Sequence, residues 1–291
     1  MATHYPVFLK ECLELLDVRP DGVYCDCTAG LGGHTGAIAA RLTGSTLTDG
    51  GRLISCDRDP QSLEMAMRNT SEFAERIDFQ HAQFSELAFK NLDGLLADLG
   101  VSRYQLTGAE RGFSFQSEGP LDMRMDQTRG MTAGDLVNSM PEKALADCIF
   151  QLGEERRARK IAGALVRARP IRSTLHLAGI VERAVPRTGP IHPATRTFQA
   201  LRMMVNGELD EIDALLVAAP KMVRPGGRIV IISFHSLEDR KVKESFRELG
   251  RTGRARILTK KPVIPGEQEL RENPPSRSAK LRAVEILEQV S

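Results

Sequence analysis

Short apolar runs alternate with helix-type segments over the first third of the chain. The runs Val23–Cys27, Arg52–Asp57, Ile77–His81 and Asp93–Asp98 have the length and composition of buried strands. A helix is predicted from Pro60 to Arg68, because proline suits the first turn of a helix. Strands and helices that alternate at this spacing predict a parallel sheet with right-handed crossovers.

The pattern changes after Asp98, where a long helix-favouring region extends to about Asn206. Strand-type and helix-type segments then resume. We expect a helix over Glu208–Ala219, a turn at 224–227, a buried strand at Arg228–Ser233, a helix over 237–249, a basic glycine-containing loop after it, a surface loop over 262–279 and a last strand at Leu281–Leu287.

These elements predict an α/β fold of the doubly wound, mostly parallel, Rossmann-like kind. Residues 1–105 and 206–291 form its sheet domain, and residues 106–205 form an inserted, mainly helical subdomain. In such sheets, ligands bind beyond the carboxyl ends of the strands, where the strand order reverses. The insertion follows the fourth strand at that same edge.

Composition narrows the class of protein. Of the 291 residues, 41% are hydrophobic and 27% are charged, which excludes a disordered, collagen-like or disulfide-scaffold protein. No stretch has the roughly 20 apolar residues of a membrane span, and Glu11 and Glu14 interrupt the first apolar segment. We therefore expect a cytoplasmic protein without membrane association.

Cysteine usage points to a reducing compartment. The chain has five cysteines, an odd number, and none of them form Cys-x-x-Cys pairs. We expect reduced, buried thiols and no metal site.

Charge is unevenly distributed along the chain. Residues 1–100 hold 8 basic and 15 acidic residues, whereas residues 151–205 hold 11 basic and 3 acidic ones. Residues 240–261 hold 9 basic and 2 acidic residues. One interpretation is that residues 1–100 bind a small ligand and that the two basic segments bind a polyanion such as nucleic acid. The alternative is that the arginines only lie on solvent-exposed helix faces, which would give the same counts.

A glycine-rich bend follows the first strand. Gly30, Gly32 and Gly33 lie between this strand and a helix expected to begin near Ala37, and such a bend lets a ligand approach bare backbone. Thr35 occupies the position where a dinucleotide-binding motif has its third glycine, which argues against a nicotinamide cofactor.

Carboxylates end two of the next three predicted strands. Asp57 is placed to accept hydrogen bonds from a ribose diol, because Asp59 directly precedes Pro60 and is the better helix cap. Asp98 is followed by a glycine and ends the fourth strand. Phe84 can lie against an adenine ring or simply belong to the core, and Gln105 follows at the same edge.

Several longer strings resemble the bacterial 16S rRNA (cytosine-N4) methyltransferases. The resemblance extends over nearly the whole chain. It is carried by His4-x-Pro6-Val7, Thr28-x-Gly30-x-Gly32-Gly33-His34, Asp57-Arg58-Asp59-Pro60, Asp98-Leu99-Gly100-Val101-Ser102, Arg111-Gly112-Phe113-Ser114-Phe115, Gly119-Pro120-Leu121-Asp122-Met123-Arg124-Met125, His192-Pro193-Ala194-Thr195-Arg196-Thr197-Phe198-Gln199 and Ser233-Phe234-His235-Ser236-Leu237-Glu238-Asp239-Arg240. Cys25 and Cys27 depart from the small or apolar residues that this family more often has there.

The resemblance implies S-adenosylmethionine as the methyl donor and one cytosine of 16S rRNA, near the decoding centre of the small ribosomal subunit, as the acceptor. The family's cofactor contacts fall on Gly32, Gly33, His34, Asp57, Phe84, Asp98 and Gln105. We expect Asp98 to be the catalytic residue, as an acceptor for the N–H hydrogens of cytosine N4. The resemblance leaves open whether the chain is a monomer or a homodimer.

Phosphate contacts are expected from the two basic segments. The candidates are Arg156, Arg157, Arg159, Lys160, Arg196, Arg202 and the basic run from Arg240 to Lys261. His235 and Ser236 are placed to face the substrate base, and the alternative for Ser236 is to cap the helix that follows it.

Two other functions fit part of the pattern. A small-molecule methyltransferase would not need the basic insertion, and an RNA-binding assembly factor would not need Gly32, Gly33, Asp57 and Asp98 together.

Overall fold

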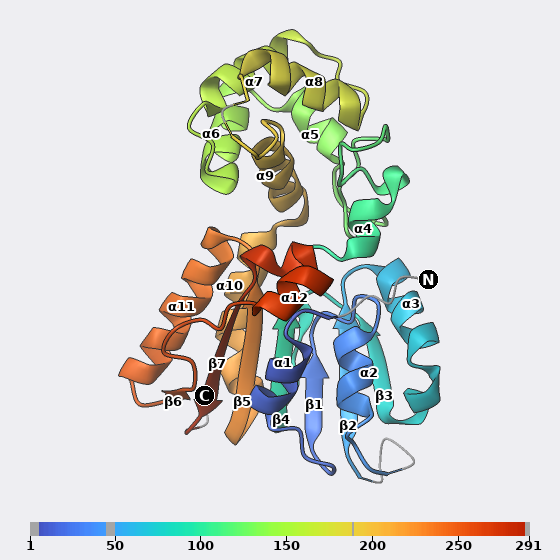
Figure 1. Cartoon of the computed structure of the whole chain (residues 1–291), viewed down its shortest axis with the longest axis vertical. Coiled ribbons are helices and arrows are strands. Elements are labelled where there is room, and N and C mark those ends of the chain that lie inside the picture. Colours follow the sequence, from blue (N-terminus) through green and yellow to red (C-terminus); the bar gives the residue numbers. More distant parts are fainter. Residues whose placement is uncertain (1–5, 45–49, 188, 289–291) are drawn as a thin grey trace. The chain divides into compact units, whose positions relative to one another are not determined.

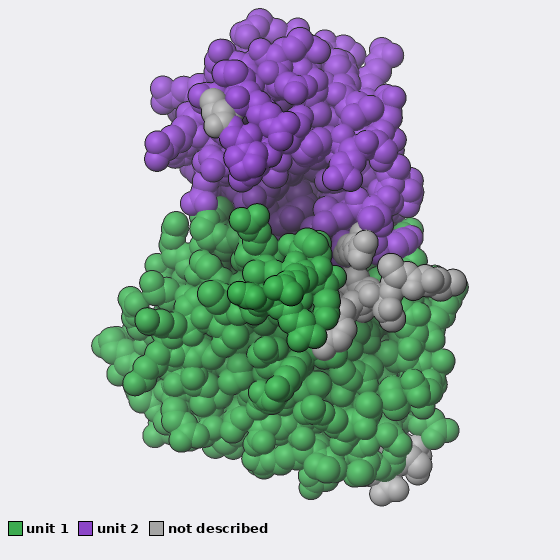
Figure 2. All heavy atoms as spheres, viewed as in Figure 1, with its two compact units in different colours: residues 1–100, 209–291 green, residues 101–208 purple. Residues whose placement is uncertain are grey.

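A computed structural model of the chain describes residues 6–44, 50–187 and 189–288. His4 of the first motif lies outside these residues. The chain divides into unit 1, residues 1–100 and 209–291, and unit 2, residues 101–208 (Figure 2). The expected boundaries were 105/106 and 205/206, whereas the division in the structure falls two residues after the strand Leu92–Asp98 and after the first residue of the helix Glu208–Met222.

Unit 1 is built on a sheet of seven strands in the order β3-β2-β1-β4-β5-β7-β6 (Figure 1). β1 to β5 are parallel, and β7 runs antiparallel to both of its neighbours, β5 and β6. The predicted doubly wound, mostly parallel sheet is thereby confirmed. The strands are β1 (Val23–Asp26), β2 (Arg52–Asp57), β3 (Ile77–His81), β4 (Leu92–Asp98), β5 (Val223–Ser233), β6 (Ala255–Ile257) and β7 (Lys280–Ile286).

Helices cover both faces of this sheet. Successive side chains of a strand therefore pack into two different apolar clusters, one on each face. On β4, Leu96 joins the cluster that contains α1 and α2, whereas Leu95 and Ala97 join the cluster that contains α10 and α11. The helices of unit 1 are α1 (Leu9–Leu16), α2 (Gly33–Ala39), α3 (Pro60–Asn69), α11 (Ser236–Arg251), α12 (Glu267–Glu272) and α10 (Glu208–Met222), whose first residue belongs to unit 2. Short 3₁₀ turns are η1 (Ser71–Arg76), η2 (Phe84–Glu86) and η4 (Pro274–Ser278).

Four expectations about local structure were wrong. The predicted turn at 224–227 lies inside β5, where the pairing with β4 slips between Leu92 and Gly94 and leaves a bulge. β6 interrupts the basic segment after α11, and α12 with η4 interrupts the predicted loop over 262–279. α2 starts at Gly33 instead of near Ala37, since the glycine-rich bend itself turns into the helix.

Unit 2 is helical and has its own core. The core gathers Leu145 and Ile149 on α6, Leu165 on α7 and Leu201 on α9, all fully buried. The elements of this unit are α4 (Arg103–Thr107), η3 (Ala109–Arg111), α5 (Ala133–Ser139), α6 (Glu142–Gly153), α7 (Ala158–Arg167), α8 (Thr174–Ala184) and α9 (Thr195–Asn206). In the described part of the chain, no helix has the length and apolar character needed to cross a membrane.

Because unit 2 is one continuous stretch with a core of its own, a fragment of residues 101–208 is expected to fold alone and unfold cooperatively. Within that fragment, Leu145→Ala removes a fully buried side chain and is expected to cost about 2–5 kcal/mol. Thermal unfolding followed by far-ultraviolet circular dichroism measures both effects.

Phe150→Ala is the matched control, because Phe150 lies on the same helix and is 58% exposed. Its expected change is within about 0.5 kcal/mol. A fragment without a cooperative transition would contradict the independence of unit 2.

Candidate active site at the carboxyl ends of the strands

The strand order of unit 1 reverses beside β1. β2 and β3 extend the sheet on one side of β1, and β4 and β5 extend it on the other. The loops after β1 and β4 therefore leave the sheet next to each other, at the position where doubly wound sheets bind ligands. The site is built from these two loops and from the carboxyl end of β2.

A buried carboxylate holds the glycine-rich loop. Asp26, with no exposed surface, accepts hydrogen bonds from the Thr28 backbone N–H (3.1 Å) and from the Thr35 hydroxyl (2.7 Å). The Thr28 hydroxyl oxygen in turn accepts the backbone N–H of Asp98 at 2.7 Å. This chain of hydrogen bonds ties the loop after β1 to the end of β4.

Gly32 is required where the loop enters α2. Its φ is 86°, a left-handed conformation, and a Cβ at this position would lie 3.2 Å from the backbone of Ala66 on α3. Gly33 and His34 then form the first turn of α2, which no side chain caps within the described residues. The first N–H groups of this helix therefore lie beside the loop.

Asp57, the last residue of β2, accepts backbone hydrogen bonds from two segments, the glycine-rich loop and the start of α3. One carboxylate oxygen accepts the N–H of Gly30 and the other accepts the N–H of Asp59, both at 2.8 Å. Burial raises the pKa of Asp57 to about 6, although these two hydrogen bonds lower it. Asp59 caps α3 as predicted, but Asp57 is not left free of protein contacts, since the loop uses it as a hydrogen-bond acceptor.

Asp98 has an oxygen without a partner. Its Oδ1 is buried and meets no hydrogen-bond donor in the described part of the chain, and its Oδ2 lies 3.9 Å from Nδ1 of His34. Burial raises the pKa of Asp98 well above its ordinary value, and the negative charges of Asp26, Glu238 and Glu269 raise it further. Such a group favours a cation or a hydrogen-bond donor beside it.

The other predicted cofactor residues differ in their surroundings. His34 is buried, and its Nε2 lies 3.0 Å from the Val7 carbonyl oxygen, so its ring connects the segment before α1 to α2. Phe84 starts η2 and packs in part against the core on the α10 side of the sheet. Gln105 belongs to unit 2, where its side chain accepts the N–H of Ser102 as half of a capping box.

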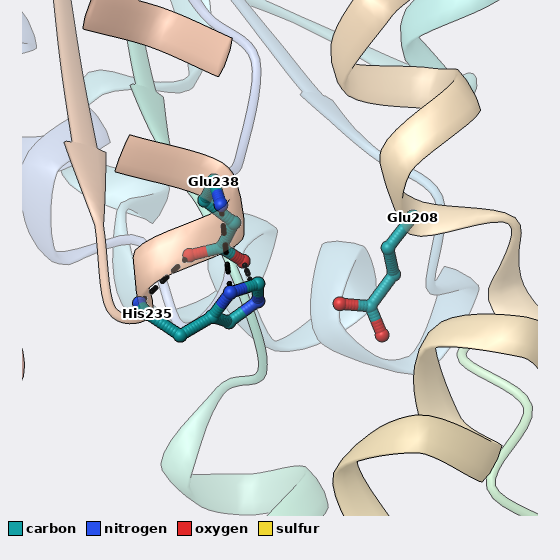
Figure 3. Close-up of side chains that lie close together, drawn as sticks. All are labelled: Glu208, His235 and Glu238. Carbon is teal, nitrogen blue, oxygen red and sulfur yellow. Dashed lines mark hydrogen bonds and ion pairs between the residues drawn. The ribbon is translucent and has the colours of Figure 1, made fainter. Parts of the chain in front are cut away.

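His235 and Glu238 open α11, directly after β5 (Figure 3). His235, not Ser236, is the cap residue, because its Nδ1 accepts the N–H of Glu238. Glu238 accepts the N–H of Phe234 at 2.8 Å, and its other oxygen lies 2.9 Å from Nε2 of His235. The alternative that Ser236 caps this helix was therefore wrong, and both ring nitrogens of His235 face Glu238. Arg240 is exposed on the next turn.

The predicted RNA-contacting arginines of unit 2 differ in their exposure to solvent and in their partners. Arg202 makes a two-point ion pair with Glu208, at 2.8 and 2.7 Å, and its side chain is only 15% exposed. Arg196 is exposed, and its guanidinium donates to the backbone carbonyl oxygen of Glu154. Arg156, Arg157, Arg159 and Lys160 are also exposed.

Two carboxylates near Asp98 were missed at the sequence level. Glu238 has a recognisable signal, because it stands three residues after the cap residue of a helix that follows a buried strand. Glu269 has none: it lies in the segment expected to be a loop, on α12, where it accepts the N–H of Phe8 at 2.8 Å. All five cysteines are buried and free, as expected.

The strand order defines a class of protein, the doubly wound α/β folds, whose members bind ligands at the edge where the β1 and β4 strands end. A solved structure with this fold is that of a Clostridium thermocellum protein provisionally assigned as an rRNA methylase. It is 9% identical, has a TM-score of 0.50 and covers 98% of this chain and 100% of its own. This likeness supports the doubly wound, Rossmann-like fold.

The family follows from sequence similarity. The model of the MraW methylase family matches residues 1–287, and the chain belongs to this family. It is 58% identical to ribosomal RNA small subunit methyltransferase H of Solibacter usitatus, over 97% of this chain and 99% of the relative. The corresponding protein of Acidobacterium capsulatum is 51% identical, over 97% and 98% of the two chains.

Proposed function

We propose that this protein transfers a methyl group from S-adenosylmethionine to N4 of one cytosine in 16S rRNA, near the decoding centre of the small ribosomal subunit. The observation that carries the proposal is the full-length similarity to proteins named ribosomal RNA small subunit methyltransferase H. The cytosine and its N4 atom come from the resemblance of the motifs described above. We further propose that the enzyme works in the cytoplasm.

The residues at the strand ends fit this cofactor. Asp57 has two carboxylate oxygens, each with a further lone pair for a ribose hydroxyl. The acidic groups around Asp98 favour the positive charges of a sulfonium and an amino group. The loop with Gly32, Gly33 and His34 offers backbone N–H groups, and we assign Phe84 and Gln105 to the same cofactor.

S-adenosylmethionine supplies a methyl group on a sulfonium centre, which is already activated for transfer. The protein's task is therefore to position the acceptor and to exclude water. Cytosine N4 is a weak nucleophile, because its lone pair is delocalised into the ring. We assign Asp98 to accept one N–H hydrogen of N4, which favours the pyramidal form of the amino group with an available lone pair.

The enzyme must also hold the target cytosine outside the RNA base stack. A cytosine within folded RNA can reach a buried site only when its nucleotide leaves the stack, and the enzyme then has to bind the flanking phosphates. We assign this role to the exposed basic residues of unit 2, with Arg196 among them, and to Arg240 of α11. His235 and Arg202 have carboxylate partners in the structure, so we expect smaller direct contributions to RNA binding from them.

The function is tested by incubating the protein with tritiated S-adenosylmethionine and either free 16S rRNA or small subunits from cells that lack this enzyme. We expect label in one cytidine, recovered as N4-methylcytidine after digestion and mass spectrometry. The two substrates also establish whether the enzyme acts on the free RNA or on the assembled particle. Absence of label from both, or label at another atom, would contradict the proposal.

Asp98→Asn is expected to lower kcat/KM for methyl transfer by more than tenfold, because it replaces a carboxylate acceptor beside the reacting nitrogen. The same change is expected to leave the free energy of unfolding unchanged or to increase it. The reason is that burial makes the ionised carboxylate costly in the folded protein, where its pKa is raised. Tritium transfer and denaturant unfolding measure the two quantities.

Asp21→Ala is the control, since Asp21 is an exposed carboxylate ahead of β1 in the same unit. Near-normal cofactor affinity and turnover in Asp98→Asn would remove Asp98 from the site.

Cofactor affinity is expected to fall as the pH drops through about 6. Below this pH the Asp57 carboxyl binds a proton and loses an acceptor for the ribose hydroxyls. Linkage to one proton gives up to about a tenfold rise in Kd for each further pH unit. Isothermal titration calorimetry of S-adenosylmethionine between pH 5 and 8 measures this, with Asp57→Asn as the reference. If the two proteins show the same pH dependence, Asp57 does not contact the cofactor.

A further inference from the structure

Three aromatic rings of unit 2 contact one another in a row that begins in the core and ends at a partly exposed ring. Phe198 on α9 is 4% exposed and contacts Phe115 edge-on, with ring centroids 4.8 Å apart. Phe115 is half-buried and lies against the His192 ring, with centroids 4.6 Å apart and planes inclined by 34°. The His192 side chain is 28% exposed and is the outermost of the three rings.

The orientation of the outer ring is fixed. Nδ1 of His192 accepts the backbone N–H of Ala194 at 3.1 Å, so the proton of the neutral ring resides on Nε2. Nε2 lies 3.7 Å from Oε1 of Glu182, beyond hydrogen-bond distance. The stack therefore ends in a partly exposed ring that is held in place by Phe115 and by the backbone, and that retains an N–H donor.

Two guanidinium groups are anchored in or beside the segments that flank this ring in the sequence. The Arg157 guanidinium donates to the Pro186 carbonyl oxygen at 3.3 Å, in the segment that leads from α8 to His192. Arg196, four residues after His192 and in the first turn of α9, donates to the Glu154 carbonyl oxygen at 3.0 Å and makes a long ion pair of 3.9 Å with Glu155. A carbonyl oxygen orients each guanidinium group without neutralising it, and the Arg196–Glu155 ion pair is long, so both groups remain suited to phosphate.

We propose that His192 and Phe115 form a stacking site for one unpaired nucleobase of the RNA substrate, with Arg157 and Arg196 contacting the adjoining phosphates. The RNA as ligand rests on the proposed function, whereas the stacking site is argued from the geometry of unit 2 alone. Aromatic rings flanked by cations are a recurring way to bind single-stranded RNA, because every base has a face to stack. The site therefore binds a flanking nucleotide with little preference for base identity.

The probe is a short, unstructured RNA that carries one 2-aminopurine, whose fluorescence is quenched when it stacks on an aromatic ring. With the full-length protein we expect saturable quenching. His192→Ala is expected to abolish the quenching and to weaken RNA affinity by about tenfold or more. His192→Trp, which keeps a stacking surface, is expected to retain both.

His176→Ala is the matched control. His176 is an exposed histidine on α8 of the same unit, with no aromatic ring in contact among the described residues. Its quenching and affinity are expected to equal those of the wild type. Thermal unfolding of each variant shows whether unit 2 stays folded.

Equal affinity and quenching in His192→Ala and the wild type would overturn the proposal. So would an equal loss in His192→Ala and His192→Trp, because the ring would then only support its own loop. The test is independent of methyl transfer: a protein that quenches the probe but methylates no rRNA refutes the proposed function, and one that methylates rRNA without quenching refutes the stacking site.

Discussion

The buried carboxylate of Asp26 is the constraint on which the site of unit 1 depends. It sits inside the sheet at the end of β1 without exposed surface, and an unpaired charge there would be strongly destabilising. Thr28 and Thr35 supply its hydrogen bonds, and in doing so they fix both ends of the glycine-rich loop. The Thr28 hydroxyl also accepts the N–H of Asp98. This hydrogen bond fixes the position of the loop after β1 relative to the end of β4. The positions of Asp57 and Asp98 follow from that arrangement.

Much of unit 1 is predictable from sequence, because buried parallel strands are short, apolar and bounded by turn residues. β2 and β3 have the bounds that their apolar runs predict, and β2 and β4 end at the predicted aspartates, Asp57 and Asp98. The elements missed were those with weak local signals: β6 has three residues and exists through its pairing with β7, and α12 lies among prolines and glutamates. Asp57 was misjudged for a related reason, since its partner Gly30 is 27 residues away and only the fold brings them together.

The chemistry of a side chain did not reveal its role where that role depends on tertiary contacts. His34 belongs to a glycine-rich motif, yet its ring reaches the Val7 carbonyl oxygen and Asp98. Arg202 looks like its exposed neighbours in the sequence, but it is bound by Glu208. His235 resembles a substrate contact and serves as a helix cap. In each case the residue type was noticed correctly, and the partner far along the chain or on the next helical turn determined what it does.

The position of β7 between β5 and β6 has a consequence for synthesis on the ribosome. The chain emerges from its amino end, so unit 2 is complete while the sheet of unit 1 still lacks β5, β6 and β7. β6 cannot find its neighbour until residues 280–286 have left the exit tunnel. Vectorial folding thus begins with the helical insertion and with the first four strands, and the sheet closes only when its carboxyl-terminal strand slides between two strands that were made before it.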